Sequence, residues 1–260
     1  MRLKQYITEG RSKELKENEV IDLIKKNCKQ ALNKYKKGIV IYRGVEMGVS
    51  YAFVDPKSGK PRRSANTSNY YTLINDNSPL WKQYPKRSES LICTTNKFTP
   101  EGYGTSYIVL PYDNAKIGVC SESDYWDSFP NLFRLIDDGY YNIGSFNHEL
   151  ETLFEQVDIP LSDNSYNGIQ HSFGLFDLTF NHDIESIESL IYEDEYNILK
   201  GYDKVWDLMK HFNILLAPEP NKFGLYKISN LGKYKEREVW TDSKAVLVNT
   251  HNNRHILDEL

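Results

Sequence analysis

The sequence predicts an α+β fold, and two kinds of pattern predict it. Apolar residues recur every three or four positions from Val20 to Tyr35, which is typical of an amphipathic helix. Short runs rich in β-branched and aliphatic residues follow, bounded by turn-forming residues, which is typical of strands. Six or more strands, an early helix and a helical insert together indicate an α+β architecture.

The expected elements follow one another in a clear order. Strands are predicted at residues 38–44, 90–95, 106–111, 115–120, 236–240 and 245–249. Residues 121–220 differ from the rest, because they carry helical patterns separated by loops rich in Asp, Asn and Gly. Turn formers predict a long loop or hairpin at 46–69 and a loop with aromatic side chains at 221–235.

Composition excludes several classes of protein. The 260 residues are 40% hydrophobic and 13% aromatic, enough for a packed core and too much for global disorder. A net charge of −4 argues against bulk binding to a nucleic-acid backbone. No apolar run approaches the roughly 18 residues that span a bilayer. Three cysteines without CxxC spacing argue against a disulfide framework or a zinc site, so we expect a reducing cytoplasm.

Arg43 is the first candidate functional residue. The chain has only nine arginines, and this one ends an apolar strand next to Gly44. A guanidinium held at a strand end presents a rigid fork of donors that suits a diphosphate or a carboxylate. The alternative is a partly buried arginine paired with a structural acid.

Glu236 and Glu238 form the second candidate group. Residues two apart on a strand point to the same face, so we expect both carboxylates to lie side by side. One acid can orient a sugar hydroxyl and stabilise developing positive charge while the other positions a nucleophile. The alternative is a solvated strand face.

The third group is Cys93-Thr94-Thr95 at the end of a predicted strand, preceded by Ser90. Small hydroxyls at this position can orient a carboxylate through hydrogen bonds. The alternative is an ordinary strand with alternating polar residues. A nucleophilic Cys93 is a weaker hypothesis, because no histidine is paired with it by sequence context.

Taken in order, these motifs resemble the arginine-serine-glutamate class of mono-ADP-ribosyltransferases. Ile41-Tyr-Arg43-Gly44 resembles the family's early arginine strand, and Leu91-Ile-Cys93-Thr94-Thr95 resembles, imperfectly, its Ser-Thr-Ser strand. Glu236-Arg-Glu238 resembles its E-x-E motif. The resemblance covers residues 15–120 and 221–250. It implies a single domain over residues 10–260, with a two-sheet mixed β core, an N-terminal helix and a largely helical insertion at about 121–220.

The resemblance also implies roles for individual residues. Arg43, beside Gly44, would hold the diphosphate or adjacent ribose of NAD, the substrate that this family uses without a metal. Glu238 would bind the ribose 2′-hydroxyl and stabilise the cation, and Glu236 would engage the acceptor, with arginine side chains favoured. In the loop before this motif, Phe223, Tyr226 or Tyr234 would touch the target.

One departure from the family concerns its first serine, which is replaced by Cys93. The hydrogen bond to Glu238 then falls to Cys93, to Thr94, or to Ser90 in a shifted register. Thr95 completes this cofactor-binding group. His251 and His255 lie four residues apart, but without a third ligand they are expected to be surface residues.

The first residues carry a second resemblance. Ile7-Thr8-Glu9-Gly10 is similar to the cleavage site of capsid-targeting peptides in internal head proteins of T4-like bacteriophages. This similarity implies a leader at residues 1–9, packaging in the phage head, and injection into the bacterial cytoplasm.

The leading hypothesis is therefore an NAD-dependent mono-ADP-ribosyltransferase, a phage effector that modifies host macromolecules. The acceptor is expected to be host protein, with RNA or DNA as the alternative and no membrane partner. Two other functions stay open: an NAD glycohydrolase with the same site, and a catalytically inactive host-binding protein of the virion interior.

Overall fold

The computed structural model describes residues 11–59, 62, 72, 75, 76, 78–129, 216–251 and 253–260. The predicted leader at 1–9 and most of the predicted insertion at about 121–220 lie outside these residues. The chain divides into two compact units. The first comprises Met1–Arg62, Lys82–Ser128 and Asn221–Leu260, and the second comprises Arg63–Trp81 and Phe129–Pro220. All the candidate residues belong to the first unit.

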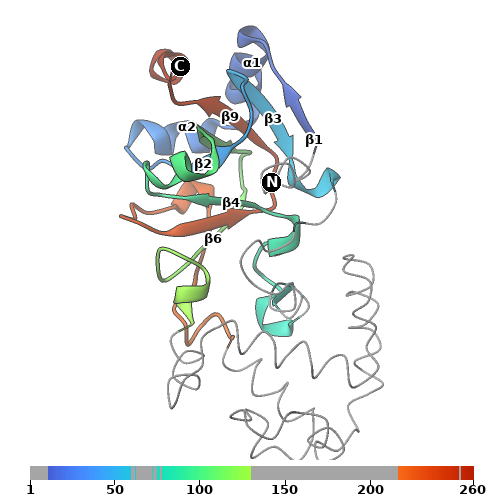
Figure 1. The fold of residues 1–260 in the computed structure, drawn as a ribbon, viewed down its shortest axis with the longest axis vertical. Helices are drawn as coiled ribbons and strands as arrows, with labels where there is room; N and C mark the ends of the chain where they lie inside the picture. Colours follow the sequence, from blue (N-terminus) through green and yellow to red (C-terminus); the bar gives the residue numbers. More distant parts are fainter. Residues whose placement is uncertain are drawn as a thin grey trace, which may run out of the picture. The chain divides into compact units, whose positions relative to one another are not determined.

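The first unit is built on one antiparallel sheet of nine strands, in the order β1-β3-β9-β5-β2-β4-β8-β6-β7 (Figure 1). The strands are β1 (Arg11–Glu14), β2 (Tyr42–Val45), β3 (Tyr51–Asp55), β4 (Leu91–Thr94), β5 (Thr105–Pro111), β6 (Lys116–Val119), β7 (Gly224–Lys227), β8 (Glu238–Thr241) and β9 (Ala245–Asn249). Together with the helices, this sheet confirms the α+β class.

The expected two-sheet mixed core needs correction. Each pairing among the described strands is antiparallel, and the nine strands are connected by hydrogen bonds into a single sheet. The two halves of this sheet, β1-β3-β9-β5-β2 and β4-β8-β6-β7, meet through one residue pair, Tyr42 opposite Thr94. Strand direction depends on which strands become neighbours, and the pattern within each strand carries no information about its neighbours.

Two helices cover the first half of the sheet (Figure 1). The single helix expected from the apolar periodicity is divided at Cys28 into α1 (Glu17–Asn27) and α2 (Lys29–Lys36). The α1 helix contacts β3 and β9, and α2 contacts β5 and η7 (Ile228–Asn230). The buried face of both helices therefore packs on the central strands of the first half.

A short C-terminal helix, α9 (His255–Glu259), closes this half. The hydroxyl of Tyr35 donates to Asp258 Oδ1 at 2.8 Å and accepts from Arg254 Nε at 2.7 Å. His251 and His255 are both exposed. The remaining short 3-10 turns are η2 (Pro56–Ser58), η3 (Pro79–Trp81), η4 (Arg87–Glu89), η5 (Thr99–Tyr103) and η6 (Trp126–Ser128).

Two stretches expected to be rich in turns contain strands. The first, residues 46–69, was expected to be a long loop or a hairpin, and it contains β3, whose residues pair with β1 on one side and β9 on the other. The second, 221–235, contains β7, which pairs with β6 at the edge of the sheet. Nearby Pro and Gly residues weaken the sequence signal of both strands. The strands form because neighbouring strands supply their hydrogen bonds.

Candidate functional site

The three sequence motifs lie on three neighbouring strands. Arg43 is on β2, Thr94 is on β4 and Glu238 is on β8, and these strands are adjacent in the order β2-β4-β8. The guanidinium of Arg43 donates from Nη1 to the main-chain carbonyl of Ile92 on β4. The sheet therefore brings together residues that are far apart in the sequence.

Gly44 allows a close approach beside Arg43. A β-carbon at this position would lie 2.1 Å from the carbonyl oxygen of Pro100, closer than any side chain can tolerate. Glycine is therefore required for η5 to pack directly on β2. Two residues at the ends of this turn, Phe98 and Tyr103, are exposed.

Register decides which small residue faces Glu238. Thr94 is the direct partner of Glu238 on β8, and Cys93 is the partner of Val239. Because neighbouring residues of a strand point to opposite faces, Thr94 shares the face of Glu238 while the buried Cys93 side chain belongs to the other face. Ser90 precedes β4, and its Oγ donates to the carbonyl of Lys86 at 2.6 Å. Of Ser90, Cys93 and Thr94, it is Thr94 that lies in direct register with Glu238.

Thr95 ties the end of β4 to the E-x-E segment. Its main-chain N–H donates to the carbonyl of Arg237 at 2.9 Å, and its Oγ1 accepts from the N–H of Arg237 at 2.9 Å. Thr94 Oγ1 accepts from the N–H of Asn96 at 3.1 Å. The two bonds between Thr95 and Arg237 fix the backbone immediately before Glu238.

Glu236 and Glu238 do not share a strand face. The strand β8 begins at Glu238, and Glu236 lies before it in a bend, where it is exposed. The alternation that predicts side-by-side carboxylates holds only within regular strand, so that expectation is wrong. Glu238 is therefore partly buried, whereas Glu236 is exposed.

Glu238 pairs with an arginine that the sequence analysis did not select. Glu238 Oε1 lies 2.8 Å from Nη2 of Arg87 in η4, and Arg87 is only 5% exposed. Burial is the largest single influence and lowers the pKa of Arg87. The charge of Glu238, the electrostatic effects of Tyr125 and Cys120, and the hydrogen bond to Glu238 together outweigh it, so the pKa is raised. The sequence feature that could have identified Arg87 is its position just before a predicted strand in a chain with only nine arginines.

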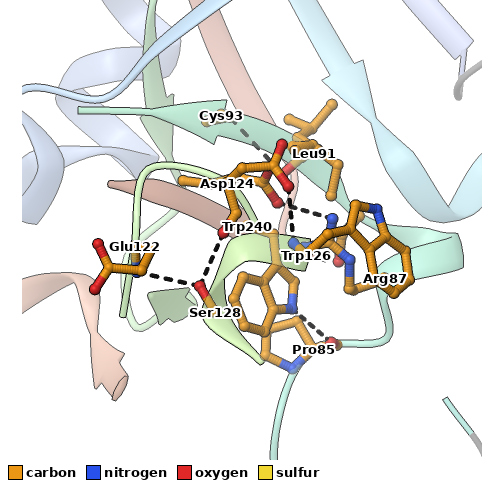
Figure 2. Close-up of polar contacts among 12 residues, drawn as sticks. Pro85, Arg87, Leu91, Cys93, Glu122, Asp124, Trp126, Ser128 and Trp240 are labelled. Atoms are coloured by element: carbon orange, nitrogen blue, oxygen red, sulfur yellow. Dashed lines mark hydrogen bonds and ion pairs between the residues drawn. The ribbon is translucent and has the colours of Figure 1, made fainter. Parts of the chain in front are cut away.

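Aromatic rings surround the ion pair. The guanidinium carbon of Arg87 lies 3.6 Å from the ring centroid of Tyr125 and 5.3 Å from that of Trp240. Trp240 donates from Nε1 to the carbonyl of Pro85 at 2.8 Å (Figure 2). A β-carbon on Gly118, which faces Trp240 across the sheet, would lie 2.3 Å from the indole ring, so this position requires glycine.

The three expected target-contacting residues have different environments. Tyr226 on β7 is exposed, and its ring lies 6.2 Å from that of Tyr234. Burial, followed by the hydrogen bond with Tyr226, raises the pKa of Tyr234. Phe223 is buried against Tyr125 and Trp240, so its side chain belongs to the core around the ion pair.

Among the residues that the structure describes, no group of three or more His, Cys, Asp or Glu is placed to hold a metal ion. No helix in the described part of the chain is long and apolar enough to span a membrane. Comparison with family models, with curated proteins and with solved structures gives no match. A function for this chain is therefore inferred from the geometry around Glu238 and from the sequence motifs.

Proposed function

We propose that the protein is an NAD-dependent mono-ADP-ribosyltransferase with Glu238 as its central carboxylate. One observation carries the proposal: Thr94 and Glu238 are in direct register on adjacent strands, and Arg43, which follows Tyr42, the other register partner of Thr94, extends its guanidinium to the carbonyl of Ile92 on β4. An oxocarbenium-like ribose needs a fixed carboxylate beside it, and a dinucleotide needs a cation for its diphosphate. The proposal includes an ADP-ribosyltransferase-like fold for the core of the first unit.

The proposed chemistry uses each residue for a separate task. Arg43 binds the diphosphate, and Glu238 accepts a hydrogen bond from the 2′-hydroxyl of the nicotinamide-bearing ribose. The nicotinamide–ribose bond breaks because the leaving group departs neutral, and Glu238 stabilises the positive charge that develops. Glu236, exposed before β8, engages the acceptor, for which arginine side chains are favoured.

The proposed setting is the cytoplasm of a bacterium infected by a phage. Its support is the Ile7-Thr8-Glu9-Gly10 segment. Mass spectrometry of the protein from phage particles tests this setting. A chain that still begins at Met1 in the particle contradicts the leader.

Incubation with labelled NAD and bacterial lysate tests the activity. We expect wild-type protein to label host macromolecules and Glu238→Gln to label them at least about 100-fold more slowly. The matched control is Glu122→Gln, which changes an exposed glutamate paired with Arg237 at 3.3 Å. We expect Glu238→Gln to fold, because its glutamine side chain still offers Arg87 an acceptor oxygen. Thermal unfolding of each variant verifies this.

The outcomes separate the alternatives. Equal labelling by wild type and Glu238→Gln, or none by either, contradicts the transferase. Release of nicotinamide without labelled macromolecules identifies a glycohydrolase. Absence of NAD binding at millimolar concentration by calorimetry identifies a binding protein without activity. Mass spectrometry of the labelled products then distinguishes arginine, RNA and DNA acceptors.

A further inference from the structure

The ion pair between Arg87 and Glu238 is costly to bury. Removing two charges from water carries a penalty that their attraction repays only with good geometry, so such pairs are weak contributors to stability. Here the arginine is 5% exposed and its nitrogen lies 2.8 Å from the carboxylate. A fold that needed only stability at this position would be equally well served by apolar side chains. The pair therefore calls for a role beyond stability.

The guanidinium of Arg87 contacts aromatic rings as well as the carboxylate of Glu238. The ring of Tyr125 lies 3.6 Å from the guanidinium carbon. The loop that carries Tyr125 is closed by the buried Ser128, whose Oγ accepts from the N–H of Glu122 at 3.1 Å and donates to the carbonyl of Asp124 at 2.8 Å (Figure 2). The second ring, that of Trp240, is anchored to Pro85. Arg87 thus occupies a rigid aromatic enclosure.

The turn that carries Arg87 is fastened to strand β4. The N–H of Ser90 donates to the carbonyl of Arg87 at 3.3 Å, and Ser90 Oγ donates to that of Lys86 at 2.6 Å. Leu91 then begins β4, whose last residue, Thr94, is the register partner of Glu238. One short segment therefore approaches Glu238 at two points, through a guanidinium at its start and a threonine at its end.

We propose that Arg87 is a positioning residue for Glu238. Its contact with Oε1 fixes the direction of Oε2 toward a ribose hydroxyl. This inference rests on the proposed function, and it adds a residue outside the three motifs. In this chain the carboxylate is oriented by a buried cation from η4, while Cys93 lies on the opposite face of the sheet.

Enzyme kinetics on the full chain test the inference. The variants are Arg87→Met, which removes the charge and retains most of the volume, and Arg87→Lys, which retains the charge without the planar fork. Lys57→Met is the control, because Lys57 pairs with Asp242 at 2.6 Å in a partly exposed ion pair of the same unit. The assay follows nicotinamide release from NAD across a range of pH, with thermal unfolding in parallel.

We expect Arg87→Met to lower kcat by about 10- to 100-fold with little change in KM, because NAD still binds while the carboxylate is misplaced. Arg87→Lys should keep the wild-type KM but lose part of kcat, and Lys57→Met should match the wild type in both constants.

Two results overturn the inference: a folded Arg87→Met with wild-type kcat, or, where Arg87→Met does not fold, an Arg87→Lys with wild-type kcat. A purely structural role would lower the unfolding temperature without lowering kcat at a temperature where the variant is folded. Failure of the proposed function looks different, because the wild type itself then releases no nicotinamide at any pH, and the positioning role is overturned with it.

Discussion

The two halves of the sheet bury different chemistry. In the half formed by β1, β3, β9, β5 and β2, the central strands are filled with aliphatic side chains, and α1 and α2 cover them. In the half formed by β4, β8, β6 and β7, an ion pair lies among Tyr125, Phe223 and Trp240. The first half has the composition of a stability core, and the second keeps charges where burial is expensive. The second half therefore holds the candidate carboxylate and its buried cation, and Arg43 lies on β2, the strand of the first half that borders it.

The largest expected effect compares one large core residue from each half. Trp240→Ala should lower the free energy of unfolding by about 3–5 kcal/mol, and Leu110→Ala by about 2–5 kcal/mol. Both side chains are fully buried. Only Trp240→Ala should also reduce nicotinamide release out of proportion to stability, since Trp240 encloses Arg87. Urea unfolding and activity at a temperature where both variants are folded provide the measurement. Equal activity of the two would remove the functional distinction between the halves.

The second prediction concerns the ion pair alone. Arg87→Met should lower the free energy of unfolding by about 3–5 kcal/mol, because it leaves the Glu238 carboxylate without its buried cation. The double variant Arg87→Met/Glu238→Gln should be more stable than Arg87→Met, since neither charge remains unpaired. A double-mutant cycle by urea unfolding measures this coupling. Strictly additive losses would show that the pair contributes no coupling energy.

A smaller effect is expected from the polar contact of the first half. Tyr35→Phe removes the hydroxyl that connects Arg254 and Asp258. The cost should be about 1 kcal/mol, and nicotinamide release should stay at the wild-type level, because the change lies outside the second half. Thermal unfolding and the activity assay check both parts. Loss of activity in a folded Tyr35→Phe would contradict the expectation that this contact contributes to stability alone.

The smallest effect is expected from the three buried thiols. Burial, followed by the charge of Asp113, raises the pKa of Cys28 to about 12, and burial raises the pKa of Cys120 well above its usual value. Both thiols should therefore resist iodoacetamide at about pH 8 in the folded protein and react in urea. In Arg87→Met, Cys120 should become reactive before Cys28. Mass spectrometry after timed alkylation distinguishes local loosening of the second half from global unfolding.

Several parts of the fold were predictable because their signals are local. The apolar periodicity of Val20 to Tyr35 predicts the helical region, although the break at Cys28 is invisible in it. The aliphatic runs predict β5 and β9, which are buried almost throughout. By contrast, β3 lies in a stretch expected to be a long loop or a hairpin and β7 in one expected to be a loop, because their hydrogen-bonding partners come from other parts of the chain. Local propensity cannot register such partners.

The candidate site shows the same division. The order of Arg43, the Cys93-Thr94-Thr95 segment and the Glu236-Arg-Glu238 motif along the chain was enough to select these groups as candidates. The sequence could not choose among Ser90, Cys93 and Thr94, because a choice requires the register between β4 and β8. It also extended a strand to Glu236, which the structure places in a bend.

The α+β class and three motifs that bear chemistry follow from the order of amino acids alone, since the periods of helices and strands and the identities of charged residues are local properties. That β2, β4 and β8 are neighbours, that Thr94 faces Glu238, and that Arg87 pairs with that glutamate became known only from the folded chain. Strand order and register join segments separated by long stretches of chain, and packing between those segments, rather than pattern within them, fixes such contacts.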